Sequence, residues 1–416
     1  MSKFKLDVWT TRDFPRTWTH VIKGSFVDPQ FDTRGTTDLF CYNRNAGIGA
    51  FFATVKNGRL DDGTFVQDGP RQVGPNHTFN RQWTHIVHVA AGEVKLLFYD
   101  ATSGTAEFYA TDGQGNLILK KRHLGWRTSW ALIVPGRFGK KTIATPPFQP
   151  PITRQRAHLL FYDPTEGIGE FFSVDDSGDI HLERRVNGWL KTWHSILAGN
   201  FSNGEFDDLL FYDKARGAAE FYQTHDDIGR TLLSEHTNWR TTWQHIVPGQ
   251  FLQNAPFDGL LFYQEASGHT EFYSTDGHGH LSQIDIDPGD QWRLPWQAIF
   301  AGEFTPNIGL FNTERLCSYD PRDGVLRYFF LEQTTIRTLI DLNGRWTAGG
   351  TRNAVISAAF TSLTVDMSAF HRPAAHGTIV DGSTITVPFP DDATFTGKLQ
   401  LPNIIRWSNG SAWTKV

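Results

Sequence analysis

Cysteine and methionine are both scarce in this chain of 416 residues, which contains two of each. Two cysteines, Cys41 and Cys317, are too few for a disulfide scaffold or for a zinc site built from cysteine alone. They fall in repeated segments, described below, at positions one step apart, so their side chains should face opposite ways. We therefore expect two reduced, apolar side chains and no disulfide between them.

Long apolar runs are missing as well. No stretch of about 18 consecutive apolar residues occurs, so the sequence contains no candidate for a transmembrane helix. The first residues, Met-Ser-Lys-Phe-Lys-Leu-Asp, lack the uninterrupted apolar segment of a signal peptide. These features predict a cytoplasmic protein, with release by a non-classical route left open.

Charge is neither high nor concentrated. The formal net charge is −5, and the sequence has no block of lysine and arginine. This argues against nucleic acid and against an anionic membrane as the main partner, and it favours a small or neutral ligand. The oligomeric state stays open.

Recognised catalytic motifs are absent. The sequence has no Gly-x-Ser-x-Gly nucleophile elbow, no phosphate-binding loop, no dinucleotide-binding glycine pattern and no His-Glu-x-x-His. We therefore expect no cofactor. Whether the protein is an enzyme stays open, because an enzyme that works by holding a reactive substrate in shape needs no such motif.

Aromatic residues, in contrast, are abundant, with 33 Phe, 14 Trp and 10 Tyr, and many of them recur in order. Leu-Leu-Phe-Tyr occurs four times and is followed each time, after a glycine turn, by Glu-Phe-Tyr or Glu-Phe-Phe. The four copies begin at Leu96, Leu159, Leu209 and Leu260, and diverged copies span Leu39–Phe52 and Leu316–Phe330. The chain is therefore an array of repeats, with six copies of this segment.

A second segment lies between these copies and consists of tryptophan, apolar residues, glycine and phenylalanine. It begins at Trp18, Trp83, Trp130, Trp193, Trp243 and Trp296, and a version without tryptophan spans Arg352–Phe360. Successive starts are 47 to 65 residues apart. Each unit contains short segments rich in aromatic and β-branched residues, separated by turns such as Asp112-Gly113, which is typical of four strands.

Four-stranded units of this length predict an all-β protein with a β-propeller fold. Because the second segment occurs seven times, we expect seven blades, with six blades and a separate C-terminal unit as the alternative. Phe4–Trp9 aligns with the outer strand Leu117–Lys121, so the N-terminal strand should close the ring by completing the last blade, which Val355–Phe360 would open.

The predicted domains are residues 1–360, the propeller repeats, and residues 361–416, an irregular C-terminal β segment that packs on the propeller or closes it. About 55 residues are marginal for an independent domain without disulfides or metal. Two insertions, Asn57–Arg81 and Lys140–Arg154, should form surface loops.

Tryptophans occur in pairs at the start of several units, in the pattern Trp-x-x-x-Trp. The pairs are Trp126-Arg127-Thr-Ser-Trp130, Trp189-Leu-Lys-Thr-Trp193, Trp239-Arg240-Thr-Thr-Trp243 and Trp292-Arg-Leu-Pro-Trp296. A sugar offers an apolar C–H face and a belt of hydroxyl groups, which an indole ring flanked by arginine can bind. The alternative is packing between blades, which we expect more of the second tryptophan in each pair than of the first.

Two further patterns are candidates for metal sites. Turns such as Thr111-Asp-Gly-Gln-Gly115 lack the alternating carboxylates and distal glutamate of a calcium loop, so we interpret them as hairpin turns. His20, His85 and His245 occupy the same position on three inner strands, where they could bind a metal or simply line a wet channel. We favour the channel and predict no metal.

The complete repeat, Leu-Leu-Phe-Tyr-Asp, Gly-x-x-Glu-Phe-Tyr, Thr-Asp-Gly-x-Gly and Gly-Trp-Arg-Thr-x-Trp, resembles that of the fucose-binding seven-bladed propeller lectins. The resemblance covers about residues 80–305 well, the flanks weakly and the tail not at all. It implies binding of fucose-type glycans in pockets between adjacent blades. At the positions that match the motif, the ligand-binding residues would be Trp126, Arg127, Trp189, Trp239, Arg240 and Trp292.

Departures from the repeat keep a second function open. An aromatic pocket can fold a polyene without any recognisable motif, so the alternative is a cofactor-free tailoring enzyme of the cycloaddition or cyclisation type, for example a hetero-Diels–Alder catalyst. Its single site would combine His20 and His85 with Phe370, His371 and Arg372, which otherwise form an ordinary turn before Pro373. A protein-interaction platform would fit the scaffold but no particular residue.

Overall fold

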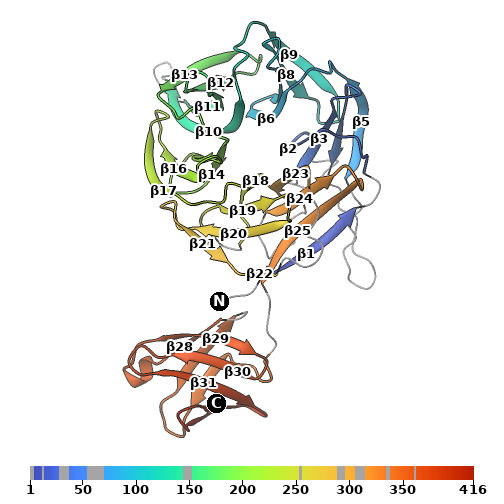
Figure 1. Cartoon of the computed structure of the whole chain (residues 1–416). Coiled ribbons are helices and arrows are strands. Elements are labelled where there is room, and N and C mark those ends of the chain that lie inside the picture. Colours follow the sequence, from blue (N-terminus) through green and yellow to red (C-terminus); the bar gives the residue numbers. More distant parts are fainter. Residues whose placement is uncertain are drawn as a thin grey trace. The chain divides into compact units, whose positions relative to one another are not determined.

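The computed structural model describes residues 4–11, 14–27, 37–53, 70–143, 152–252, 255–287, 296–304, 314–333, 338–359 and 362–416. These residues form β-strands and one 3₁₀ turn, Ser368–Phe370, and contain no α-helix. Strands β1 to β25 build six sheets arranged as the blades of a propeller, and strands β26 to β33 close into a barrel (Figure 1). The all-β propeller fold predicted from the repeats is confirmed.

The blades follow one another along the chain, and in each of the first five the strands run in sequence order from the inner to the outer edge. Blade 1 has β2 (His20–Gly24), β3 (Asp38–Asn43), β4 (Ile48–Ala53) and β5 (Arg71–Thr78), and blade 2 has β6 (His85–Ala91), β7 (Val94–Asp100), β8 (Thr105–Thr111) and β9 (Leu117–His123). Blade 3 has β10 (Leu132–Ile143), β11 (Ile152–Asp163), β12 (Ile168–Val174) and β13 (Ile180–Asn187). Blade 4 has β14 (Ser195–Gly199), β15 (Asp208–Asp213), β16 (Ala218–Thr224) and β17 (Arg230–His236), and blade 5 has β18 (His245–Gly249), β19 (Gly259–Gln264), β20 (His269–Thr275) and β21 (Leu281–Ile284).

Blade 6 contains the N-terminal strand. Its order from the inside is β23 (Ala298–Gly302), β24 (Arg315–Asp320), β25 (Val325–Gln333), β1 (Phe4–Thr11) and the short β22 (Ile286–Asp287). The inner strands β2, β6, β10, β14, β18 and β23 lie in sequence around the ring, and β23 returns to β2. The N-terminal strand therefore closes the ring, as predicted, but the blade that it completes is opened by β23 and not by Val355–Phe360. The ring has no open sheet in the part that the structure describes.

The propeller has six blades and not seven, which was the alternative that the sequence left open. The segment expected to open a seventh blade forms β27 (Ala354–Ala359), which pairs with β26 (Gly344–Thr347) and β28 (Ser362–Asp366) of the barrel. No copy of Leu-Leu-Phe-Tyr follows this segment, so the strands needed to fill a blade are missing, and β1 already completes blade 6. The barrel thus takes in residues 344–359, which the repeat pattern assigned to the propeller.

The hydrophobic core lies between neighbouring blades. Along Leu96–Tyr99, alternate side chains point to opposite faces of the sheet: Leu96 and Phe98 pack against blade 1, and Leu97 and Tyr99 pack against blade 3. The second tryptophan of each unit fills the same space. Its exposed fraction is 8% or less at all six described positions, which are Trp18, Trp83, Trp130, Trp193, Trp243 and Trp296. These tryptophans are packing residues, as expected.

In five of the six copies, counting the diverged ones, the structure describes a hydrogen bond by which the tyrosine of the Leu-Leu-Phe-Tyr segment links its blade to the next. Tyr212 donates a hydrogen bond to the carbonyl of Arg240 (2.5 Å), and Tyr162 donates one to the carbonyl of Leu190 (2.6 Å). The acceptor is each time the residue directly after the first position of the next Trp-x-x-x-Trp segment or its counterpart. Equivalent bonds join Tyr42 to Asn80, Tyr99 to Arg127 and Tyr319 to Pro15. The loop that carries the first tryptophan is therefore fixed by the preceding blade.

The two insertions differ from the expected loops where the structure describes them. Residues 140–143 and 152–154 are paired strand residues, because β10 and β11 extend outward as a ribbon in which Ile143 lies opposite Ile152. Of the other insertion, residues 57–69 lie outside the described residues, and Arg71–Thr78 forms β5, the outer strand of blade 1.

Both cysteines are buried free thiols, as expected. Their positions do face opposite sides of their own sheets. Because Cys41 faces blade 6 and Cys317 faces blade 1, this orientation brings both into one core cluster at the place where the ring closes.

The barrel has its own core. Its further strands are β29 (Ala375–Asp381), β30 (Thr384–Pro388), β31 (Thr394–Gln400), β32 (Ile404–Trp407) and β33 (Ala412–Lys415), and β33 pairs with β26 to complete the closure. Buried side chains from its strands and turns, among them Trp346, Ile385 and Ile405, form one apolar cluster. Because the sheet is closed, each of its strands has a hydrogen-bonded neighbour on both sides, and this requires no disulfide or metal. None of the described segments is a helix of the length and apolarity needed to cross a membrane.

Deleting residues 1–11 should destabilise the propeller. The deletion removes β1 from its place between β25 and β22, which leaves the backbone groups along β25 without partners. At about 1 kcal/mol for each lost hydrogen bond, we expect the free energy of unfolding to fall by on the order of 5 kcal/mol. Thermal and chemical denaturation would measure this. Deletion of Val416, which is 72% exposed, is the control, and equal stability of the two truncated proteins would contradict the closure by β1.

Candidate functional site

In the three pairs that the structure describes, the first tryptophan lies in the loop between two blades, and its environment differs from junction to junction. Trp126 and Trp239 are half-buried, whereas Trp189 is only 8% exposed. Trp292 lies outside the described residues. The predicted binding residues are thus brought to junctions between blades, but the junctions are not equivalent.

An open cavity of about 440 Å³ lies at the junction of blades 4 and 5. We call it the Trp239 pocket. Its lining residues are His236, Asn238, Trp239, Arg240, Trp243, Phe262, Glu271, Tyr273 and Leu281. Trp239 is held edge-on by Phe262, with ring centroids 4.9 Å apart, and it lies beside Tyr212 at 5.8 Å and His236 at 5.4 Å. Its loop position follows from the hydrogen bond that Tyr212 donates to Arg240.

Glu271 is the charged centre of this pocket. Its carboxylate accepts hydrogen bonds from the Tyr273 hydroxyl (2.7 Å) and from His269 Nε2 (2.8 Å), and Arg240 Nη2 lies 3.0 Å from Oε1. Burial acts to raise the pKa of Glu271, but these hydrogen bonds and the charge of Arg240 outweigh it and lower the pKa below its ordinary value. The pocket therefore presents an ionised carboxylate and a guanidinium beside an indole ring.

The outer strand explains why Glu271 is more exposed than its counterparts in blades 2 and 3. In blades 2 and 3, the equivalent Glu107 and Glu170 are each covered by an arginine of their own outer strand, Arg122 and Arg185. The same repeat position in blade 5 falls at Ile286, where the chain has left the blade and pairs as β22 with β1. The side chain of Glu271 is 13% exposed, against 6% for Glu107 and for Glu170.

The junction of blades 3 and 4 is filled by the protein itself. Arg230 places its guanidinium carbon 4.5 Å from the ring centre of Trp189, 5.0 Å from Tyr222 and 5.6 Å from Phe211. Burial lowers the pKa of Arg230 to about 10. In the repeat, this position is Leu117, Ile180 or Leu281 in the other blades. A cation inside an aromatic cage occupies the space that a ligand would need.

The junction of blades 2 and 3 has the tryptophan but a different arginine geometry. Arg127 lies 5.5 Å from the ring centre of Trp130 and 3.5 Å from the carboxylate of Asp163, not beside Glu170. At the junction of blades 1 and 2, Phe79 replaces the tryptophan and stacks on Phe98 at 4.8 Å.

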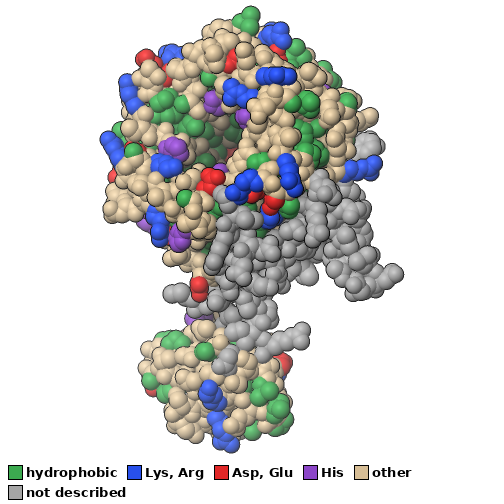
Figure 2. Space-filling model, turned by 45° about the vertical axis from the view of Figure 1, so that its right-hand side comes forward, with side chains coloured by type: hydrophobic (Ala, Val, Ile, Leu, Met, Phe, Trp, Pro, Cys, Tyr) green, Lys and Arg blue, Asp and Glu red, His purple; other side chains and the backbone are tan. Residues whose placement is uncertain are grey.

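The histidines of the inner strands connect blades. His85 Nε2 donates to the carbonyl of Ala131 (3.0 Å), and His20 and His245 hydrogen-bond to the backbone of Thr84 and Trp296 in the next unit. Figure 2 shows histidine side chains around a hollow in this face of the propeller. Burial lowers the pKa of all three, so they are neutral near pH 7.

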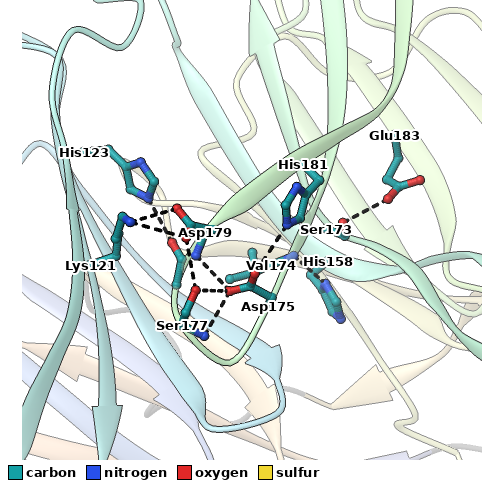
Figure 3. A network of polar contacts seen from close by, with 11 residues as sticks. Lys121, His123, His158, Ser173, Val174, Asp175, Ser177, Asp179, His181 and Glu183 are labelled. Atoms are coloured by element: carbon teal, nitrogen blue, oxygen red, sulfur yellow. Dashed lines mark hydrogen bonds and ion pairs between the residues drawn. The ribbon is translucent and has the colours of Figure 1, made fainter.

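The Asp-Gly turns also join blades. The carboxylate of Asp175 accepts hydrogen bonds from Ser177 and Asp179 within its own turn, as a hairpin turn requires (Figure 3). The carbonyl of Gly178 accepts a hydrogen bond from His123 of blade 2 (2.9 Å), and Lys121 pairs with Asp179 at 3.2 Å. The same His-to-Gly bond recurs from His77 to Gly115 and from His236 to Gly279. These turns are structural, which agrees with their interpretation as hairpins.

Residues of the alternative single site belong to separate parts of the structure. Phe370 and Arg372 line a cavity within the barrel, His371 is exposed with a left-handed backbone (φ 57°) that ends the 3₁₀ turn, and His20 and His85 lie on propeller strands. All residues that line the barrel cavity come from the barrel itself.

The sequence pattern did not single out Glu271, Tyr273 and His236 as site residues. Glu and Tyr belong to the Glu-Phe-Tyr motif, which on its face indicates a strand. A signal was present, because a charged residue repeated at one position of a buried strand requires a partner or a ligand.

No protein-family model matches the sequence, and no curated protein matches it. Among solved structures, a protein from Lactobacillus plantarum matches over 93% of this chain and 93% of its own, with 11% sequence identity and a TM-score of 0.32. At that score the likeness carries no argument. Fold and site rest on the chain's own repeats and geometry.

Arg230→Leu should open the junction of blades 3 and 4. In blade 5, leucine at this position lines the open Trp239 pocket. In blade 4, the change from arginine to leucine also removes a charge that is costly to bury. We expect a cavity beside Trp189 in a crystal structure of the variant, and a free energy of unfolding within about 1 kcal/mol of the original. Arg184→Leu, on the exposed side of the same junction, is the matched control. A loss well above this value, or a collapsed cavity, would show that Arg230 is a structural residue.

Stability should fall between pH 6.5 and pH 4, in part because of His88. Burial, with the charges of Lys95 and Lys23, lowers the pKa of His88 to about 4, and its ring packs edge-on against Phe26 at 5.3 Å. The unfolded chain binds a proton near pH 6.5 and the folded chain only near pH 4, so acid favours unfolding across this window, by on the order of 3 kcal/mol for this group. His88→Ala, which copies Ala198 and Ala301 of other blades, should flatten the pH dependence of the unfolding free energy. An unchanged slope would refute the assignment to His88.

Proposed function

We propose that the propeller binds a glycan in the Trp239 pocket. The observation that carries this proposal is the combination of a half-exposed indole ring with an ionised carboxylate and a guanidinium in one cavity. Trp239 can stack on the C–H face of a sugar ring, while the Glu271 carboxylate accepts and Arg240 donates hydrogen bonds to its hydroxyl groups. Tyr273 and His236 add polar groups at the wall.

The resemblance of the repeat to fucose-binding propeller lectins makes fucose-type glycans the first ligands to test. One pocket of this kind supports an affinity between roughly millimolar and micromolar, since few hydrogen bonds and one stacking contact are made. The filled junction at Arg230 and the covered carboxylates of blades 2 and 3 favour fewer sites than blades. Multivalent binding would then depend on how many chains come together.

A glycan array with monosaccharide competition, performed on the full chain, is the direct test. Trp239→Ala should weaken binding at least about tenfold, which corresponds to about 1.4 kcal/mol. Glu271→Gln should also weaken it, because an amide replaces one acceptor oxygen by a donor. Calorimetric titration with the best monosaccharide of the array would give affinity and stoichiometry.

Two tryptophan variants serve as matched controls. Trp126 packs on Tyr99 and His123 at 5.9 and 5.4 Å, almost as Trp239 packs on Tyr212 and His236. Because Glu170 is covered there, Trp126→Ala should match Trp239→Ala in stability but retain binding. Trp243→Ala removes a side chain that is 3% exposed and should chiefly cost stability, about 3–5 kcal/mol. Equal binding loss in the Trp126 and Trp239 variants would exclude a unique role for the Trp239 pocket.

The tailoring enzyme stays the alternative prediction. If no glycan binds and the pocket takes a single apolar small molecule instead, the lectin proposal fails and cyclisation assays on polyene substrates become the next experiment. The neutral inner histidines and the aromatic cavities are compatible with that chemistry, but no observation favours it over binding alone.

A further inference from the structure

The barrel contains a cavity of about 220 Å³ that the propeller proposal does not use. Six of its thirteen lining residues are aromatic, and the full set is Trp346, Ala348, Ala354, Met367, Phe370, Arg372, Phe389, Asp392, Phe395, Trp407, Asn409, Ser411 and Trp413. Pockets for drug-sized ligands start at about 300 Å³, so this cavity suits a ligand of about one ring.

The aromatic rings form a preformed cup. Trp407 and Trp413 meet edge to face with centroids 5.1 Å apart, and Phe389 lies 6.0 Å from Trp407 and 5.9 Å from Phe395. Trp346 and Trp407 are 1% and 5% exposed, whereas Trp413 and Phe370 are only half-buried. The floor is therefore fixed by the core, and the half-buried rings can receive a ligand face.

The charged groups at this cavity are one guanidinium and two carboxylates. Arg372 is paired with Asp391 through two hydrogen bonds, Nε to Oδ2 at 2.8 Å and Nη2 to Oδ1 at 2.9 Å. Asp392, which lines the cavity, is 3.5 Å from Arg372 Nη2 and its side chain is 48% exposed. The guanidinium group of Arg372 is thus paired with Asp391, and the carboxylate of Asp392 can still accept a hydrogen bond from a ligand.

We propose that the barrel cavity is a second, separate binding site, and that it takes one ring of a neutral sugar. A sugar ring combines an apolar face for Trp413 and Phe370 with hydroxyl groups that donate to Asp392. A quaternary ammonium ion would fit the aromatic cup but has no N–H or O–H group to donate to Asp392. An anion would meet two carboxylates against one guanidinium, and a hydrocarbon would offer Asp392 no donor.

The test uses the full chain carrying Trp239→Ala, so that the barrel is measured without the Trp239 pocket. A panel of neutral monosaccharides and their methyl glycosides is titrated by saturation-transfer NMR and calorimetry, with tetramethylammonium and acetate as competing probe classes. We expect one sugar to bind with roughly millimolar affinity. Trp413→Ala should weaken this binding at least about tenfold.

Asp392→Asn keeps the size of the side chain and should weaken binding several-fold, which decides the matter if Trp413→Ala disturbs the barrel. Val380→Ala, at a barrel residue that is 54% exposed and does not line the cavity, is the control. Sugar binding unaffected by both cavity variants, no sugar binding in the Trp239→Ala background, or binding of tetramethylammonium or acetate alone would overturn the proposal. Failure of the propeller site would be seen separately: sugar binding by the chain would then be the same with and without Trp239→Ala.

Discussion

The hydrogen bond from the tyrosine of a Leu-Leu-Phe-Tyr segment to the loop of the next blade, described for five of the six segments, is the contact on which the site geometry depends. Its ring lies in the core between two blades, and its hydroxyl leaves that core to hold a backbone carbonyl. Burial raises the pKa of Tyr212 to about 12, so the group stays a donor at any physiological pH. Through this bond, the strand of one blade places the tryptophan and arginine of the following junction. A blade is therefore incomplete without its neighbour, which is why ring closure by the N-terminal strand matters for every junction.

The same repeat places different side chains at equivalent positions of each junction. The glutamate of Glu-Phe-Tyr is covered where the outer strand supplies Arg122 or Arg185, and it is accessible where the chain leaves blade 5 before Ile286. In blade 5, Leu281 at one repeat position lines an open cavity, whereas in blade 4 Arg230 at the same position fills the junction. Whether these junctions are open or filled thus depends on a few residues at positions where the packing of the blades accepts either kind of side chain.

The barrel is stabilised in a different way, by closure of its own sheet. Its strands are short, and only closure gives them partners on both edges, so the barrel can hold its own apolar core. An expectation based on length alone placed this segment against the propeller, since about 55 residues seldom bury enough surface. The strands β26 and β27, which precede that segment, add the residues that complete the barrel and include the buried Trp346.

The sequence by itself determined the fold class, the positions of six repeats, the closure of the ring by the N-terminal strand and the packing of the second tryptophans, because each follows from local alternation and periodicity. It also indicated the junctions as places for ligands. Only the tertiary structure decided the blade count, since the segment 354–359 can pair in either context and pairs where partners exist. It alone showed that no arginine of the outer strand covers Glu271 and that Arg230 fills the space beside Trp189. The positions of these residues recur with the repeat, but only the packing of neighbouring blades shows which side chains meet across a junction, and this separates an open pocket from a filled one.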